Sequence, residues 1–116
     1  MFIDSHCHLT YEPLIDSIPK IVEDCEKSFV MKLLTIGTNI QSSLKCIDIS
    51  NEYKNIYSSV GIHPVEAHIE IDKKEQIQKL YQSSKKIIGY GETGLDFYYS
   101  TEEKKSQIEL FEAHIK

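Results

Sequence analysis

The chain has 116 residues, 41% of them hydrophobic and 27% charged, which is the composition of one folded domain and excludes a disordered segment. The net charge is -5 and every cationic side chain is a lysine, which argues against a broad basic surface for nucleic acid. No apolar run reaches membrane-spanning length and no secretory leader pattern opens the chain, so we expect a cytoplasmic protein that uses no membrane. The three cysteines lack paired spacing, which excludes a disulfide framework.

Four short β-type runs alternate with helical patterns along the chain. The runs cover residues 2–8, 32–38, 56–63 and 87–92. Their spacing of roughly 25 to 30 residues is that of one strand and its returning helix. Repeated β/α units favour parallel strands with right-handed crossovers and helices on the outside. The pattern predicts the α/β class and leaves open whether the sheet closes into a barrel.

The helical patterns differ in strength. Residues 18–29 carry one apolar stripe at intervals of three and four, and Pro19 suits the first turn of that helix. A weaker pattern predicts a second helix over residues 44–53. Asp72 with Glu75 three residues later predicts the start of a third helix.

The last helix is predicted to start at a capping box of Ser100 and Glu103 and to run to the end of the chain. His114 falls within this helix, and His68 falls within a polar connection. Neither histidine ends a predicted strand, so we interpret both as ordinary surface or helix residues.

Two histidines end the first predicted strand. Side chains alternate across a strand, so His6 and His8 are expected on one face and Cys7, buried and inert, on the other. The carboxyl ends of parallel strands are where α/β folds place their chemistry. Two converging imidazoles predict a metal site, and the alternative is a pair of solvated histidines at a strand end.

Two further predicted strands end in residues of acid/base or metal-binding type. Glu92 ends the fourth run in a glycine-flanked turn, with Asp96 four residues later, and His63 ends the third run before a proline. A carboxylate can complete a histidine metal site or bridge two cations. The alternatives are a loop carboxylate that caps the next helix and a plain turn histidine. We favour one shared site at the carboxyl edge of the sheet.

The segments 2–9 (FIDSHCHL), 61–64 (GIHP) and 91–97 (GETGLDF) together resemble, in order and spacing, the first signatures of the TatD family of metal-dependent hydrolases. The resemblance implies a distorted TIM-type (β/α) barrel of eight units, which needs about 250 residues. Residues 1–116 would then be the N-terminal half of a TatD-type hydrolase barrel, with its first four β/α units.

The resemblance also implies roles for individual residues. His6 and His8 match one metal site, and Glu92 matches the carboxylate shared by two metals and takes part in catalysis. His63 matches a catalytic histidine beside the substrate phosphate, and Asp96 matches a substrate-binding acid. The implied cofactors are two divalent cations, with magnesium expected and manganese or zinc as alternatives.

The function implied by the resemblance is a deoxyribonuclease that hydrolyses single-stranded or nicked DNA from an end through metal-activated water. The family's later ligands have no counterpart before Lys116, so we expect this chain alone to be inactive. We expect it to self-associate or to pair with a separate C-terminal half. The alternatives are another barrel hydrolase, acting on a phosphomonoester or a cyclic amide, and a catalytically dead half-barrel that serves as an oligomerisation module.

Overall fold

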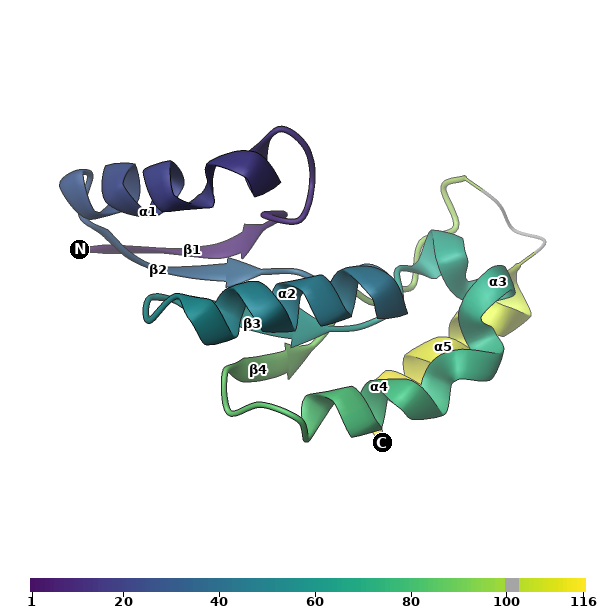
Figure 1. The fold of residues 1–116 in the computed structure, drawn as a ribbon. Coiled ribbons are helices and arrows are strands. Elements are labelled where there is room, and N and C mark those ends of the chain that lie inside the picture. Colours follow the sequence, from purple (N-terminus) through teal and green to yellow (C-terminus); the bar gives the residue numbers. More distant parts are fainter. Residues whose placement is uncertain (100–102) are drawn as a thin grey trace.

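The computed structural model describes residues 1–99 and 103–116, which form a parallel sheet alternating with helices (Figure 1). The predicted α/β class is confirmed. The four strands lie in the order of the chain, and each pairs in parallel with the next. They are β1 (Phe2–Cys7), β2 (Val30–Thr35), β3 (Ile56–Val60) and β4 (Ile87–Tyr90).

Longer helices follow the strands and pack beside them (Figure 1). They are α1 (Ile18–Lys27), α2 (Ile40–Glu52), α4 (Lys74–Tyr81) and α5 (Lys104–Ile115). The short α3 (Ala67–Glu70) and the 3-10 turns Leu14–Ser17, Pro64–Glu66 and Ile71–Lys73 complete the connections. Among the described residues, no helix is long and apolar enough to cross a membrane.

Local sequence explains where the first two long helices begin. Pro19 lies in the first turn of α1, as predicted, where its missing N–H costs no helical hydrogen bond. A capping box starts α2: the Asn39 side chain accepts from the backbone N–H of Ser42 at 2.8 Å, and Ser42 Oγ accepts from the backbone N–H of Asn39 at 2.9 Å. This cap fixes the connection that follows β2.

Two apolar clusters lie between the sheet and its helices. One packs α1 and α2 on the first three strands and consists of Leu9, Ile18, Leu33, Ile49 and Ile56. The other lies under α2, α3, α4 and α5 and consists of Ile47, Val60, Ile62, Ala67, Ile77, Ile87 and Leu110. Because the second cluster includes Ile62 and Leu110, the end of β3 and the last helix share one core.

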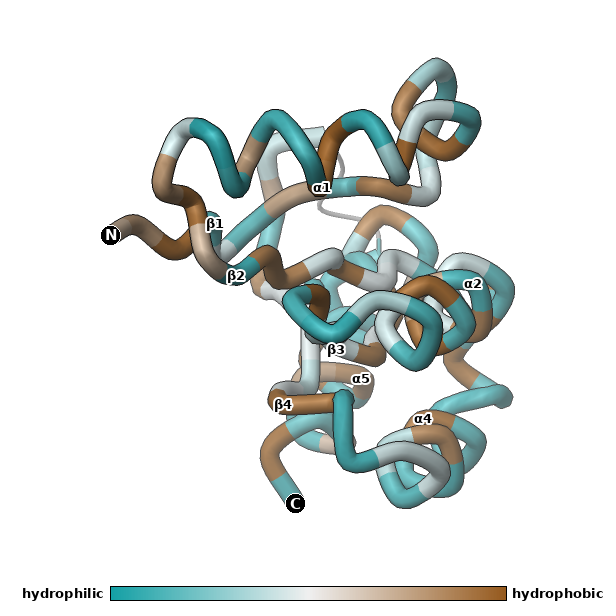
Figure 2. The backbone as a smooth tube through the Cα atoms, turned by 60° about the vertical axis from the view of Figure 1, so that its left-hand side comes forward, coloured by the Kyte–Doolittle hydropathy of each residue, from teal (hydrophilic) through white to brown (hydrophobic). Residues whose placement is uncertain are grey.

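The opposite face of the sheet is less covered (Figure 2). A shallow hollow of about 310 Å³ there is lined by Ile3, Lys32, Leu33, Leu34, Tyr57 and Ile88. Ile3 is 60% exposed and Ile88 is 55% exposed. The exposed side chains of Ile3 and Ile88 and the edge strands β1 and β4 belong to the surface that a closed barrel would bury.

The strands end earlier than the sequence predicts. β3 ends at Val60 and β4 at Tyr90, so His63 and Glu92 lie in the loops that follow these strands. The backbone N–H of His63 donates to Thr38 O at 2.7 Å, outside the regular sheet ladder. The carboxyl edge of the sheet is therefore held together by hydrogen bonds between loops.

The helix starts also differ from expectation. Lys73 is the N-cap residue of α4 and its side chain makes no capping hydrogen bond with the described part of the chain. The capping role predicted for Asp72 is wrong, because Asp72 already lies in the 3-10 turn that runs into α4. His68 lies in α3, where its Nδ1 is 3.1 Å from Glu103 Oε1. α5 begins after Glu103, and Ser100, the predicted capping partner, is outside the described residues.

Candidate metal centre

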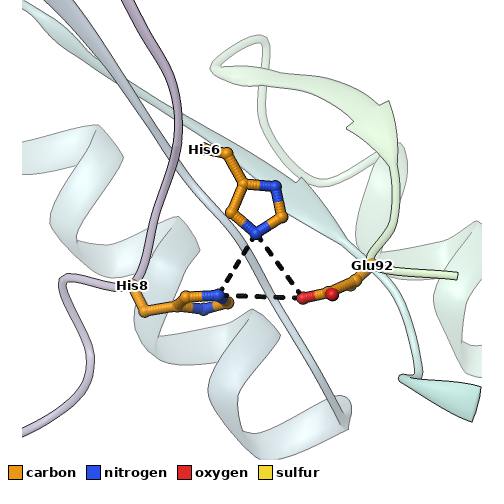
Figure 3. A group of neighbouring side chains, drawn as sticks. All are labelled: His6, His8 and Glu92. Atoms are coloured by element: carbon orange, nitrogen blue, oxygen red, sulfur yellow. Dashed lines mark hydrogen bonds and ion pairs between the residues drawn. The ribbon is translucent and has the colours of Figure 1, made fainter.

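The carboxyl end of β1 places two imidazoles on one side of the strand, as alternation predicts (Figure 3). The Nε2 atoms of His6 and His8 are 3.3 Å apart. Cys7, between them, points into the protein and its Sγ donates to Leu34 O at 3.3 Å. Burial, and less strongly the nearby Asp4 carboxylate, raises the pKa of the Cys7 thiol to about 12. The thiol is therefore an inert core group and the two imidazoles face the site.

Glu92 reaches the same point from the loop after β4 (Figure 3). Its Oε2 lies 3.7 Å from the Nε2 atoms of both His6 and His8. The backbone N–H of Glu92 donates to Gly37 O at 2.8 Å, which ties this loop to the end of β2. The three ligand-type atoms all lie within 4.8 Å of one another.

This donor set fits a divalent cation. Two imidazole nitrogens that each bind one metal at about 2.0–2.1 Å lie roughly 3.0–3.4 Å apart, depending on the coordination angle. The separation between His6 Nε2 and His8 Nε2 is 3.3 Å. His8 Nδ1 is buried and has no hydrogen-bond partner among the residues that the structure describes, so Nε2 is the nitrogen of His8 that can reach an ion. Imidazole nitrogens are donors that transition metals such as zinc accept, and a carboxylate oxygen is a donor that magnesium and manganese also accept.

His63 lies on the other side of the Glu92 carboxylate. Its Nε2 is 3.5 Å from Glu92 Oε1. The other carboxylate oxygen, Oε2, is the one that lies near His6 and His8. Its Nδ1 accepts a hydrogen bond from the backbone N–H of Val65 at 3.1 Å. A neutral ring that accepts at Nδ1 carries its proton on Nε2. The imidazole therefore presents a hydrogen-bond donor to the site.

A hollow of about 330 Å³ opens beside these groups. It is lined by His8, Tyr11, Thr38, His63, Val65, Glu66 and Glu92. The Tyr11 ring stacks on His8 with centroids 5.0 Å apart, and its hydroxyl lies 3.4 Å from Thr38 Oγ1. Sequence reasoning did not find Tyr11 or Thr38. The available signal for Tyr11 was an aromatic residue three positions after His8; Thr38 had none.

The loops that carry the site approach one another too closely for a side chain at one position. A Cβ on Gly61 would lie 2.5 Å from the carbonyl carbon of Gly91 and 2.8 Å from Glu92 O. Ser59 Oγ donates to Gly91 O at 2.6 Å and so fixes the peptide that precedes Glu92. The position of the Glu92 carboxylate thus depends on backbone contacts between the ends of β3 and β4.

A family model described as TatD related DNase matches residues 3–116. The chain belongs to the TatD related DNase family. A curated relative, an uncharacterized metal-dependent hydrolase of Buchnera aphidicola, is 36% identical over 98% of this chain and 44% of its own length. YcfH of Escherichia coli, also described as an uncharacterized metal-dependent hydrolase, is 32% identical over 98% of this chain and 43% of its own length. The chain thus spans less than half the length of these relatives.

Solved structures show the same fold. The TatD homolog YJJV of Escherichia coli superposes with a TM-score of 0.83 at 21% identity, over 98% of this chain and 45% of its own. An uncharacterized amidohydrolase from Saccharomyces cerevisiae superposes with a TM-score of 0.73 at 21% identity, over 98% of this chain and 42% of its own. The expected fold is confirmed: the four β/α units match part of the TatD-type TIM barrel.

The structure also places Asp96 and His114, two residues considered in the sequence analysis. Asp96 does not join the cluster of possible ligands within residues 1–99 and 103–116; its Oδ1 accepts from the backbone N–H of Tyr98 at 2.9 Å and shapes the loop. His114 lies in the last helix as predicted, but it is only 5% exposed and so is not a surface residue. No local pattern could show its burial, because its partner, Ile62, is distant in the sequence.

Proposed function

We propose that residues 1–116 supply the first four β/α units of a metal-dependent phosphodiester hydrolase that acts on the ends of single-stranded or nicked DNA. One observation carries the proposal: three ligand-type atoms from His6, His8 and Glu92 converge within 4.8 Å at the carboxyl edge of the sheet, beside the Nε2 donor of His63. The description of the matching family as a DNase supports DNA as the substrate.

His6 and His8 would hold one cation through Nε2, and Glu92 would be shared between two cations. When bound, such ions lower the pKa of a coordinated water towards about 7 and polarise a phosphoryl oxygen. The cations are proposed to be magnesium, with manganese or zinc also compatible with imidazole and carboxylate donors.

The chain's own residues would orient the phosphodiester. His63 donates from Nε2 to a non-bridging oxygen of the phosphate, because its Nδ1 is already occupied by the Val65 amide. Tyr11 forms one wall of the hollow and holds the His8 ring by stacking. Asp96, which shapes the loop after Glu92, is proposed to contact the substrate from the rim of the site.

The negative net charge of the chain supports a role for bound metal ions in binding the phosphate groups of DNA. The chain has a net charge of -5 and contains no arginine, so it lacks the basic surface on which many nucleic-acid-binding proteins rely. Bound divalent cations would be the largest positive charges in the site. We therefore propose that DNA binding by this region depends on the metal ions.

The three ligand-type residues that residues 1–99 and 103–116 bring together are fewer than two catalytic cations need, so further ligands are proposed to come from a polypeptide segment that completes the barrel. By itself and as a monomer, the 116-residue chain is proposed to be inactive. Self-association through the less covered face of the sheet or pairing with a C-terminal half would bury that face.

The test is a magnesium- or manganese-dependent assay on end-labelled single-stranded DNA, with the chain alone and with the later part of a TatD relative added in trans. Shortening of the label that appears only in the mixture, and disappears in Glu92→Ala and His63→Ala, is the expected result. Robust activity of the monomeric chain contradicts the proposed dependence on further ligands. Hydrolysis of a phosphomonoester or a cyclic amide, with DNA untouched, would support the competing substrate classes.

A further inference from the structure

The last helix buries two polar side chains on one face. Gln107 is 3% exposed and His114 is 5% exposed, and Leu110 lies between them on the same face at 1%. The spacing of three and then four residues places all three side chains along one stripe of the helix. Leu110 belongs to the core cluster under the end of β3, so this stripe faces the sheet and the loops at its carboxyl edge.

Each polar side chain holds the backbone of a different loop of the site. Gln107 Oε1 accepts from the Asp96 N–H at 2.9 Å, and Gln107 Nε2 donates to Asp96 O at 2.7 Å. This pair of hydrogen bonds clamps the segment that begins at Glu92. Both polar groups of the Gln107 amide are used on this one residue.

His114 holds the other loop. Its Nε2 accepts from the Ile62 N–H at 3.2 Å, while its Nδ1 donates to Leu110 O at 2.8 Å. Burial lowers the pKa of His114, which keeps the ring neutral and Nε2 available as an acceptor. Ile62 directly precedes His63, whose own N–H donates to Thr38 O at 2.7 Å. Two successive backbone amides that lead to the His63 imidazole are thus anchored.

Packing alone does not require these residue types. Burying a glutamine amide and an imidazole costs free energy that an apolar side chain of similar size would avoid, unless each polar atom finds a partner. Outside α5, these partners are backbone groups of two loops. One loop carries His63, and the other runs from Glu92 to Asp96. The same two loops also touch each other where Gly61 meets the Gly91 peptide, so a shift in one is passed to the other.

We infer that Gln107 and His114 are positioning residues, through which α5 holds the His63 loop and the Glu92 loop in the geometry that the metal centre requires. The two α5 side chains bind the backbone of the loops that carry the proposed site and contact neither the cations nor the substrate. The inference rests on the proposed function, because the loops are held for the sake of the proposed metal site. Whether α5 holds the two loops in place can nevertheless be measured without an activity assay.

The experiment uses the full chain with the variants His114→Leu, His114→Gln and Gln107→Leu. A matched control is Ser50→Ala, which removes a buried hydrogen bond to Ser58 at 3.1 Å between α2 and β3, away from these loops. Two quantities are measured: amide hydrogen exchange of His63 and Glu92 relative to Leu33 in the sheet, and the dissociation constant for Mn²⁺. Leu33 serves as reference because its N–H is bonded within the sheet region, to Asn55 O at 3.0 Å.

For His114→Leu we expect exchange of the His63 amide to accelerate about tenfold relative to Leu33. The reason is that the substitution removes the buried hydrogen bond from the adjacent Ile62 amide to His114 Nε2, which anchors this loop. For both His114→Leu and Gln107→Leu we expect Mn²⁺ binding to weaken about tenfold, the low end for loss of a group that orients a ligand. His114→Gln keeps an acceptor for the Ile62 amide and restores both quantities. Ser50→Ala lowers the melting temperature without a selective effect on His63, Glu92 or Mn²⁺.

Unchanged exchange and Mn²⁺ affinity in folded His114→Leu and Gln107→Leu overturn the inference. So does a Ser50→Ala variant that reproduces their effects, since any loss of stability would then suffice. If His114→Leu does not fold, Gln107→Leu with unaltered Glu92 exchange overturns it. If the unmodified chain binds no Mn²⁺, the proposed function fails, while the exchange of the His63 and Glu92 amides still decides whether α5 positions them.

Discussion

Substituting Gly61 by alanine should displace Glu92 from the metal centre without touching any proposed ligand. The added Cβ would lie 2.5 Å from the carbonyl carbon of Gly91 and 2.7 Å from its oxygen. Relaxed carbon contacts are about 3.5 Å, so the ends of β3 and β4 must separate by roughly 1 Å. Both neighbours are backbone atoms, which cannot rotate away as a flexible side chain can.

The expected cost has two parts. Forcing an extra methyl into a packed region destabilises a fold by about 1–3 kcal/mol. Displacing a metal-binding carboxylate by this distance should weaken Mn²⁺ binding by about 10- to 100-fold, the range found when groups that orient ligands are lost. Mn²⁺ titration by calorimetry and thermal unfolding of Gly61→Ala measure the two effects.

Gly89→Ala is the matched control, because a Cβ at Gly89 would meet no atom of the described residues within 4 Å. The same chemical change in the neighbouring strand should leave both the melting temperature and Mn²⁺ affinity close to those of the unmodified chain. If Gly61→Ala behaves like Gly89→Ala in both measurements, the close approach of Gly61 to Gly91 does not control the site and the reasoning is wrong.

Three further predictions concern the rest of the molecule. Lys86 donates to the carbonyls of residues 53, 54 and 56 at 3.1, 2.7 and 3.0 Å, so Lys86→Met should lower the free energy of unfolding by about 1–3 kcal/mol in a denaturant titration, while exposed Lys85→Met should not. Because the pKa of Cys7 is raised to about 12, its thiol stays protonated at pH 8, and mass spectrometry after iodoacetamide treatment should find it modified only after unfolding; rapid native labelling would contradict this. Ile3→Lys with Ile88→Lys should reduce self-association in light scattering, since both side chains are exposed on the less covered face; undiminished association would place the contact elsewhere.

Local pattern was sufficient to predict the metal-type cluster. His6 and His8 are two positions apart at a strand end, so alternation alone predicts that they converge, and they do. Glu92 and His63 could be added because parallel strands bring their carboxyl ends to one edge. The strand limits were predicted less well, because the backbone of His63 bonds to Thr38 in a loop rather than to a neighbouring strand.

The supporting groups could not be predicted in this way. His114 reaches Ile62 across 52 positions in the sequence, and Gln107 reaches Asp96 across a segment whose conformation no periodicity determines. The close approach at Gly61 likewise exists only once β3 and β4 lie side by side. Such contacts depend on tertiary packing, and a glutamine or histidine in a helix carries no local sign of its partner.

Pulsed EPR of Mn²⁺ added to the chain can show whether His6, His8 and Glu92 form a cation site. The arrangement predicts hyperfine coupling from two imidazole nitrogens, because both Nε2 atoms face one point. His6→Ala should leave one coupled nitrogen, and Glu92→Ala should weaken binding while both nitrogens remain coupled at higher Mn²⁺ concentration. Bound Mn²⁺ without imidazole coupling, or with coupling that survives in the His6→Ala, His8→Ala double variant, would contradict the account.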